Sequence, residues 1–213
     1  MDSVSTIGVL DKAMALLGAV ERLGAASIVD LQRATGLPRA TTHRLVVALE
    51  HHDLLRRDDD GRCHLGFALV GLGHAALAGF PLATVATPRL LALRETTGES
   101  VQLFVREGDD RRCLVSLQSP HGLRWIVAEG ALLPLTVGSA GRVLSGEPGE
   151  WIESVEEREP GVASVSAAVR DERGVVLAAV SVSGPVERLG RSPGSRFGPL
   201  VAASAEEIVA AHR

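Results

Sequence analysis

The segment after Pro38 concentrates side chains that suit nucleic-acid chemistry. Its five hydrogen-bond donors are Arg39, Thr41, Thr42, His43 and Arg44. Donors at the start of a helix are suited to the phosphates and base edges of double-stranded DNA. Residues 31–57 hold five arginines against two acids, a local charge of +3 in a chain whose net charge is −4. We therefore expect DNA contacts from residues 39–44, Ala40 included, rather than attraction of the whole chain to polyanions.

Catalytic and metal-binding chemistry finds less support. Cys113 and His121 lie eight residues apart across an expected turn, but no acid is spaced to orient them and no serine occupies a G-x-S-x-G motif. Cys63 and Cys113 are 50 residues apart with no C-x-x-C pair, which argues against a zinc site or a disulfide. We expect no enzyme activity, no metal and no other cofactor. A buried, reduced Cys113 is favoured over an oxidant sensor, which would need exposure and a reactive thiolate.

Three predicted helices position the basic segment. Residues 7–22 place apolar side chains at spacings of three and four and end at Gly24. Ser27 and Asp30 form a capping-box pattern that opens a short helix, which closes at Gly36. Pro38 then opens a third helix that runs to residue 53. Its inward-facing residues are expected to be Leu45, Ala48 and Leu49.

A hairpin is expected after the third helix. Residues 54–57 and 62–65 flank the acidic turn 58–61. The order helix, helix, tight turn, helix, hairpin is that of a winged helix-turn-helix. We expect phosphate or minor-groove contacts from Arg56, Arg57 and Arg62, whereas DNA would repel the aspartates at the tip. His51 and His52 end the third helix, where a cationic side chain favours the negative end of the helix dipole, so we interpret them as structural.

The remainder is expected to form a second domain behind a helical connector. Residues 67–79 and 82–97 have helical patterns, interrupted by Pro81 and ended by Gly98. Five strands are predicted at 100–106, 112–118, 123–128, 163–170 and 174–183, and two helices near 139–145 and 196–212. The predicted fold class is α+β with a mainly antiparallel sheet. The expected domains are 1–66 for DNA reading, 67–98 for the connector and 99–213 for the rest.

The composition limits where the protein works. Apolar residues make up 46% of the 213 residues, with 4 Phe, 2 Trp and no Tyr, so small aliphatic side chains must build the core. No run of 18 apolar residues could span a membrane, and the N-terminus lacks the basic region and small-residue cleavage site of a secretory signal. We expect a cytoplasmic protein without a membrane partner.

The chain resembles one family of regulators over nearly its whole length. Residues 8–66, GVLDKAMALLGAVERLGAASIVDLQRATGLPRATTHRLVVALEHHDLLRRDDDGRCHLG, resemble the DNA-binding domain of the IclR family of bacterial transcriptional regulators. The segments LPLTVGSAGRVL (133–144), REPGVASVSAAVRD (158–171) and VSVSGPVERL (180–189) are similar to the effector-binding domain of that family. The last two are particularly similar to an actinobacterial branch linked to amino-acid metabolism.

The resemblance implies a dimer, or a dimer of dimers, that binds a pseudo-palindromic operator. It also implies that residues 99–213 form a GAF- or profilin-like effector-binding and oligomerisation domain for a small metabolite, such as an amino acid or another small carboxylate. A Gly-rich loop that opens a helix, with serines nearby, offers donors for such a carboxylate. The effector-binding positions that the resemblance implies are Leu133, Leu135, Ser139, Ala140, Gly141, Ser164, Ser181 and Ser183.

One departure from the family puts the effector in question. Only SGEPGEWIESVEE separates the 139–144 helix from the REPGV strand, so part of one pocket wall is expected to be missing. An acidic residue that some members place on the ligand aligns with Ser154, with Glu156 or Glu157 as approximate substitutes. Trp151 is interpreted either as a lid or as an aromatic that packs the shortened loop. The alternative function is a ligand-blind regulator whose second domain serves dimerisation or partner binding only.

Overall fold

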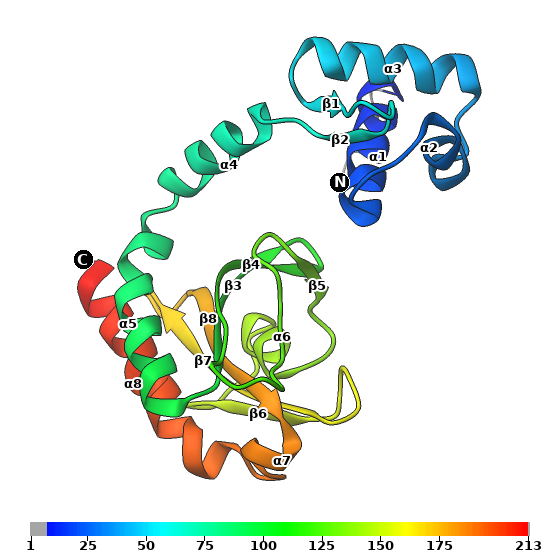
Figure 1. Ribbon diagram of the computed structural model, residues 1–213. Helices are drawn as coiled ribbons and strands as arrows, with labels where there is room; N and C mark the ends of the chain where they lie inside the picture. Colours follow the sequence, from blue (N-terminus) through cyan, green and yellow to red (C-terminus); the bar gives the residue numbers. More distant parts are fainter. Residues whose placement is uncertain (1–7, 213) are drawn as a thin grey trace. The chain divides into compact units, whose positions relative to one another are not determined.

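A computed structural model describes residues 8–212 of the chain (Figure 1). It contains two compact units, residues 1–76 and 77–213, and each is described by itself. The boundary falls inside helix α4 (Ala68–Ala78), within the segment expected to connect the domains. Ile7, the predicted first residue of the first helix, and residues 1–7 of the N-terminal stretch that lacks the pattern of a secretory signal lie outside the described residues.

The first unit has the predicted order of a winged helix-turn-helix. Its elements are α1 (Gly8–Leu23), α2 (Ile28–Thr35), α3 (Arg39–His51), β1 (Leu55–Arg57), β2 (Cys63–Leu65) and α4. The predicted capping box is confirmed, because Ser27 Oγ accepts from the Asp30 N–H (3.2 Å) and Asp30 Oδ2 accepts from the Ser27 N–H (3.0 Å). Gly36 ends α2 with a φ of 70°, a conformation that glycine adopts without strain.

A small aliphatic core joins the three helices to the hairpin. Its buried members include Leu16, Val20, Leu31, Val46, Leu49, Leu55 and Cys63. On α3 the inward stripe is Thr42, Val46 and Leu49, with Leu45 half-buried. The prediction that Ala48 faces inward is therefore wrong. Ala48 is exposed because the i, i+4, i+7 stripe centres on Val46, on a different side of the helix.

The second unit is an antiparallel sheet with helices on its faces, which confirms the α+β fold class. Its elements are α5 (Pro81–Thr97), β3 (Ser100–Glu107), β4 (Asp110–Leu117), β5 (Leu132–Pro134), α6 (Ser139–Leu144), β6 (Ile152–Val155), β7 (Val162–Arg170), β8 (Val176–Pro185), α7 (Val186–Leu189) and α8 (Gly194–His212). The strand order is β5-β4-β3-β8-β7-β6, and every neighbouring pair is antiparallel.

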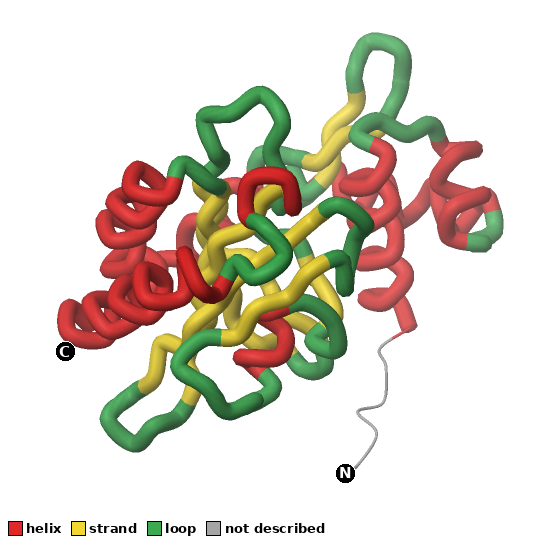
Figure 2. The backbone as a smooth tube through the Cα atoms, turned by 90° about the horizontal axis from the view of Figure 1, so that it is seen from below, coloured by secondary structure: helices red, strands yellow, loops and turns green. Residues whose placement is uncertain are grey.

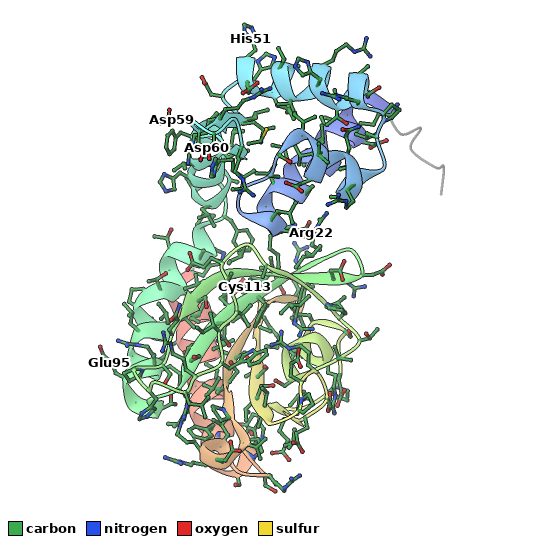
Figure 3. All side chains as sticks on the ribbon, turned by 45° about the vertical axis from the view of Figure 1, so that its right-hand side comes forward. Arg22, His51, Asp59, Asp60, Glu95 and Cys113 are labelled. Atoms are coloured by element: carbon green, nitrogen blue, oxygen red, sulfur yellow. The ribbon has the colours of Figure 1, made fainter. Side chains whose placement is uncertain are left out.

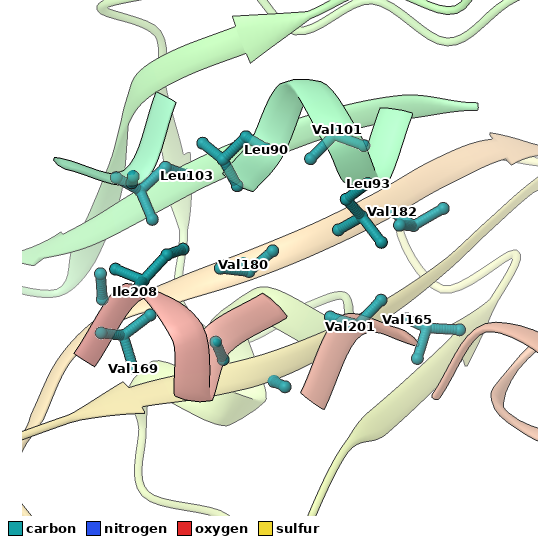
Figure 4. Close-up of a cluster of buried hydrophobic side chains, with 14 of the residues drawn as sticks. Leu90, Leu93, Val101, Leu103, Val165, Val169, Val180, Val182, Val201 and Ile208 are labelled. Carbon is teal, nitrogen blue, oxygen red and sulfur yellow. The ribbon is translucent and has the colours of Figure 1, made fainter. Parts of the chain in front are cut away.

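Helices α5 and α8 pack side by side on one face of this sheet (Figure 1). In Figure 2 the helix that ends at the C-terminus lies along one side of the strands. The main core lies between these helices and the sheet (Figure 4), and it is built almost wholly from Leu, Val, Ile and Ala. Val101 and Leu103 of β3 and Val180 and Val182 of β8 point into it. Alternation along the strands therefore sends their neighbours to the opposite face.

One predicted strand is absent. Residues 123–128 form no strand, and the short strand β5 follows at Leu132–Pro134 instead. The segment is held by side chains rather than by a backbone ladder: Ser100 Oγ donates to the Trp125 carbonyl (2.7 Å) and Ser116 Oγ donates to the Val127 carbonyl. The alternating pattern that predicted a strand reflects one buried residue, Val127, between exposed or half-buried neighbours.

Among residues 8–212, no single helix is long and apolar enough to cross a membrane. The bent pair of α4 and α5 passes that test only when the two helices are joined.

Candidate DNA-reading helix and effector cavity

The N-terminal turns of α3 present a basic surface. Arg39, Ala40, His43 and Arg44 are exposed and Thr41 is half-buried. The described part of the chain gives neither Arg39 nor Arg44 an acidic partner within ion-pair distance. Both guanidinium groups are therefore available to an external anion such as a phosphate.

Thr42 does not belong to this surface. It was expected to be an exposed donor, but its side chain is fully buried, and its hydroxyl donates to the carbonyls of Pro38 (3.2 Å) and Leu37 (3.4 Å). The expectation that Thr42 is exposed to DNA is therefore wrong. Thr42 lies four residues before Val46, on the core stripe of the helix, and it holds the first turn of α3 against the preceding loop.

The wing presents arginines along its strands and acids at its tip. Arg56 and Arg57 are exposed on β1, and Arg57 also pairs with Glu50 of α3 (2.8 Å). Arg62 is exposed, with one long hydrogen bond of 3.5 Å to the Ala25 carbonyl. All three arginines that were predicted to contact DNA phosphates or the minor groove are therefore exposed on the wing.

Asp58 has a structural role in the turn of the wing. Its carboxylate accepts from the N–H groups of Arg62 (2.8 Å) and Asp60 (3.1 Å), and it contacts His64 Nε2 (2.8 Å). The hydrogen bond with His64 is the main cause that lowers the pKa of Asp58. Asp59 and Asp60 remain exposed at the end of the turn (Figure 3).

The second face of the sheet carries polar residues and borders a partly open cavity of about 40 Å³. Sheets buried on both faces usually have apolar side chains on both. Here the alternate residues of β3, β7 and β8 include Gln102, Ser164, Ser166, Ser181 and Ser183 beside the apolar Phe104 and Ala179, and all of them are buried or half-buried. The lining includes Gln102, Phe104, Arg111, Trp125, Val127, Gly138, Ser139, Ala140, Ser154, Arg158, Glu159, Val162, Ser164, Ser181 and Ser183.

Five of the eight expected effector-binding positions line this cavity: Ser139, Ala140, Ser164, Ser181 and Ser183. The other three support it. Leu133 and Leu135 pack in an apolar cluster with α6. Gly141 lets the Leu135 carbonyl approach α6 so closely that a Cβ atom would not fit. Leu133 and Leu135, expected as pocket walls, and Gly141, expected in the effector-binding loop, are therefore not part of the cavity lining.

Several cavity donors already have partners. Ser139 Oγ lies 2.7 Å from the hydroxyls of both Ser164 and Ser166. The N–H of Gly138, at the start of α6, donates to Glu157 Oε2 (3.1 Å). Glu157 was predicted as an approximate substitute for the acidic residue that contacts the ligand in some family members. In the structure its carboxylate instead accepts from the loop N–H that was expected to bind a carboxylate ligand.

Sequence reasoning missed Arg111 and Arg158. Arg111 is 3% exposed, and its guanidinium donates to the carbonyls of Pro134 and Val137 (2.9 Å). Burial lowers its pKa to about 10, so it remains charged at neutral pH. Burial also lowers the pKa of Arg158, which lies over the Trp125 ring at 4.7 Å. Alternation along β4 could not show which face Arg111 occupies, because a bulge lies between Arg111 and Val115.

Trp151 packs against α8 and does not line the cavity. Its indole contacts the backbone at Gly194 and Gly198, and the ring joins the core between the sheet and the helices α5 and α8. Nearby, Glu153 Oε2 accepts from the Gly194 N–H (2.6 Å). The lid interpretation is wrong, because the shortened segment turns Trp151 toward the helix-covered face of the sheet.

Both cysteine thiols are buried. Burial raises the pKa of Cys113 to about 12 and also raises the pKa of Cys63. A protonated, inaccessible thiol is a poor nucleophile and a poor redox sensor. The structure therefore agrees with the interpretation of Cys113 as an inert core residue.

A winged helix with a basic first turn is the architecture of a DNA-binding domain, and in this chain it is joined to a separate unit that borders a polar cavity. Residues 9–59 match the IclR helix-turn-helix domain, and residues 74–150 and 147–210 match the bacterial transcriptional regulator IclR C-terminal domain. The chain belongs to the IclR family of bacterial transcriptional regulators. That family consists of regulators rather than enzymes.

The chain is similar to proteins that are named as transcriptional repressors. The HTH-type transcriptional repressors AllR of Salmonella typhimurium and of Escherichia coli K12 are each 26% identical over 239 residues, covering 93% of this chain and 88% of the relative. Among solved structures, an IclR transcriptional regulator from Alicyclobacillus acidocaldarius has a TM-score of 0.82 at 18% identity and covers 96% of this chain and 98% of its own. An IclR homologue from Microbacterium hydrocarbonoxydans, complexed with 4-hydroxybenzoate, has a TM-score of 0.81 at 21% identity, with 95% and 98% covered.

The comparisons also locate the missing segment. The aligned 93% of 213 residues is about 198 residues, so about 41 of the 239 aligned positions (239 − 198) have no counterpart in this chain. The IclR C-terminal domain matches in two pieces that meet at residues 147–150. This is the junction where the sequence predicts a shortened pocket wall, and in the structure Trp151 and β6 follow it directly.

Proposed function

We propose that this protein is a repressor that binds a pseudo-palindromic operator through α3 and the wing, and that a small metabolite bound in the cavity alters its operator affinity. The free guanidinium groups of Arg39 and Arg44 support the DNA part of the proposal. Thr41, His43 and Ala40 complete the base-facing surface, and Arg57 and Arg62 supply contacts to the DNA backbone.

The proposed protein partner is a second copy of the chain. The result is a two-fold symmetric DNA-binding protein, either a dimer or a tetramer built from two dimers. None of the eleven residues of α4 is buried, although its sequence ALVGLGHAALA is apolar nearly all round. Val9, Leu10 and Met14 of α1 are also exposed. Exposed apolar helix surfaces of this kind indicate a contact with another protein surface, and a two-fold dimer matches a two-fold operator.

The observation that favours an effector-responsive regulator over the ligand-blind alternative is the buried polar face of the sheet. A domain that served only dimerisation would gain stability from apolar residues where Gln102, Ser181 and Ser183 lie. A cavity of about 40 Å³ holds only a few water-sized groups, which favours a compact metabolite. We propose binding at Ser139, Ala140, Ser164, Ser181 and Ser183, backed by Leu133, Leu135 and Gly141.

The test couples two titrations on the full chain. Operator fragments are first selected from random double-stranded DNA, and fluorescence anisotropy then measures the operator affinity with and without each member of a small-acid panel. If an acid changes operator affinity by some factor, operator DNA must change the affinity for that acid by the same factor. Operator binding that no acid alters, with no acid bound by the free protein, would favour the ligand-blind alternative.

A further inference from the structure

Strand β7 has an unpaired stretch at the edge of the sheet. Its pairing with β6 ends where Ile152 meets Ser166, whereas on its other side β7 stays paired with β8 as far as Arg170. Residues 167–170 therefore form an open sheet edge. The chain before Ile152 leaves this edge because Trp151 turns toward α8. The opening lies at the shortened junction, where the two matched pieces of the C-terminal domain meet.

The backbone groups of Ala168 and Arg170 point outward from this edge. Successive residues of a strand direct their N–H and C=O groups to opposite sides. The Val162 carbonyl accepts an N–H on the β6 side (2.8 Å), and the Asp171 N–H donates to the Val175 carbonyl on the β8 side (2.9 Å). Ala168 and Arg170 share the direction of Val162. Among residues 8–212 no hydrogen bond occupies their backbone groups on that side.

A groove of about 380 Å³ runs beside the open edge. Ala167 and Ala168 of β7 form one side of it, and Ala202 and Ala210 of α8 form the other. Small side chains on both sides leave room for another backbone to approach. Because an open strand edge is a template for pairing with another chain, the groove and the edge together form a surface suited to an added strand.

The charged side chains of the groove are not paired with one another. Glu150, Arg170 and Glu206 all line it, and none of them has an ion-pair partner among residues 8–212. Arg170 Nη1 donates to the Gly174 carbonyl (3.0 Å), which leaves its charge uncompensated. The surface thus carries both signs of charge, which is the condition for complementarity with a copy of itself.

We infer that this edge and groove are a contact between the second units of two copies of the chain, in which β7 pairs with β7 of the other copy about a two-fold axis at Val169. Antiparallel pairing about that axis places Ala168 opposite Arg170 of the other copy, and the reverse, so four backbone hydrogen bonds form. Arg170 then lies beside the other copy's groove, where Glu150 is free to pair with it.

The other two-fold registers use the edge less well. An axis at Ala168 would place Arg170 opposite Ser166, whose edge β6 already occupies. An axis at Arg170 would place Ala168 opposite Glu172, which lies in the turn beyond the strand. The register about Val169 is therefore the one that engages both free residues.

This contact is separate from the dimer contact proposed for α1 and α4, and a chain that has both forms a tetramer. The inference rests on the proposed function in that respect, because it assigns the surface of the second unit that joins two dimers. It depends on the shortened junction of this chain and not on the cavity.

The register is tested with the double variant Ala168→Cys/Arg170→Cys. Paired positions in the inferred contact have Cα atoms about 5.5 Å apart, within disulfide range. Mild oxidation of the full chain is therefore expected to give a covalent dimer on a non-reducing gel. Each single variant is the control, because identical positions lie two residues apart along the pair, beyond disulfide range. Cys63 and Cys113 are buried. Cross-linking of the single variants, or none in the double variant, would overturn the register.

The surface is tested by charge exchange, with sedimentation velocity as the measurement. Arg170→Glu and Glu150→Arg are each expected to weaken the association of dimers into tetramers at least about tenfold, and the two together to restore it. Arg106→Glu is the matched control, because Arg106 also donates from a strand to a turn carbonyl, that of Gly108 (3.0 Å). A tetramer that both single variants leave intact, or a wild-type protein that stays dimeric while binding operator DNA, would overturn this contact alone. Absence of operator binding would instead overturn the proposed function.

Discussion

The indole ring of Trp151 lies directly against Gly198 of α8, at a contact so close that a methyl group on Gly198 would overlap the ring. Gly194, one helical turn earlier, lies against the same indole. The two glycines therefore form a flat site on α8 for the aromatic side chain that follows the shortened junction. The ring closes the end of the core left by the missing segment.

Gly198→Ala is expected to destabilise the second unit by about 1–3 kcal/mol, because overlap with the ring outweighs the better helix propensity of alanine. Chemical denaturation of the full chain measures the change. The penalty should largely disappear in a Trp151→Ala background, which makes the pair a double-mutant cycle. Gly18→Ala in α1, where a Cβ meets only ordinary contacts, is the control. Equal costs of Gly198→Ala in both backgrounds would contradict the contact.

Arg39→Ala and Arg44→Ala are each expected to weaken operator binding by about tenfold or more, since each removes an unpaired cation from the first turns of α3. If the lost contact is to a phosphate, the slope of log K against log salt should fall by about 1. Fluorescence anisotropy at several salt concentrations measures both quantities. Arg173→Ala, an exposed arginine in the β7–β8 turn, is the charge-matched control and should leave affinity unchanged. Full operator affinity in both α3 variants would refute this surface.

Thr41→Val is expected to lower operator affinity, whereas Thr42→Val is expected to lower stability. Thr41 is half-buried at the surface proposed to contact DNA, so its variant should lose operator affinity while keeping its melting temperature. Thr42 is fully buried with its hydroxyl bonded to Pro38 and Leu37 carbonyls, so its variant should lose about 1 kcal/mol of stability. Paired thermal melts and operator titrations decide the assignment. A Thr42→Val protein of unchanged stability that binds DNA weakly would contradict this assignment and would place Thr42 on the DNA-binding surface.

The capping box of α2 predicts a pH dependence. The Ser27 side chain is the main cause that lowers the pKa of Asp30 below its ordinary value of 3.8. A depressed folded-state pKa stabilises the unit above pH 3.8, and this contribution is lost as the pH falls from there through the depressed value. Ser27→Ala should cost about 1 kcal/mol at neutral pH and should weaken the acid dependence of amide exchange in α2. Asp30→Asn should abolish that dependence; an unchanged acid profile in both variants would argue against the capping box as its source.

The native thiols are expected to be unreactive. With a pKa of about 12, on the order of one Cys113 in ten thousand is a thiolate at pH 8, and burial denies it access to reagent. A maleimide should label neither cysteine in the native protein and both after guanidinium denaturation, as mass spectrometry would report. Rapid native labelling of Cys113 would revive an oxidant-sensing role.

Local sequence patterns were sufficient to predict the winged helix-turn-helix of the first unit. The capping box at Ser27, the left-handed Gly36 and the acidic hairpin turn each depend on residues close in sequence, so all three are visible without a structure. The cavity serines of β8 were predicted from the family resemblance, because the segment 181–184 by itself has the pattern of an ordinary strand end.

Arg111 could not be recognised because its position depends on a bulge. Phe104 pairs with Cys113 while Leu103 pairs with Val115, so Leu114 has no partner and the two ends of β4 show opposite faces. Simple alternation would place Val115 and Arg111 on the same face. The false strand at 123–128 has a similar origin, since hydroxyls of Ser100 and Ser116, distant in sequence, hold that segment.

The alternation along β8 has a consequence for how such a regulator can change. Val180 and Val182 face the helices, whereas Ser181 and Ser183 face the cavity. Adjacent residues of β8 therefore have different roles: the valines pack in the core, and the serines line the cavity. If the cavity binds an effector as proposed, a single substitution at a serine position would change the ligand preference while the valines on either side keep the domain folded, so new ligands could be acquired in small, individually viable steps.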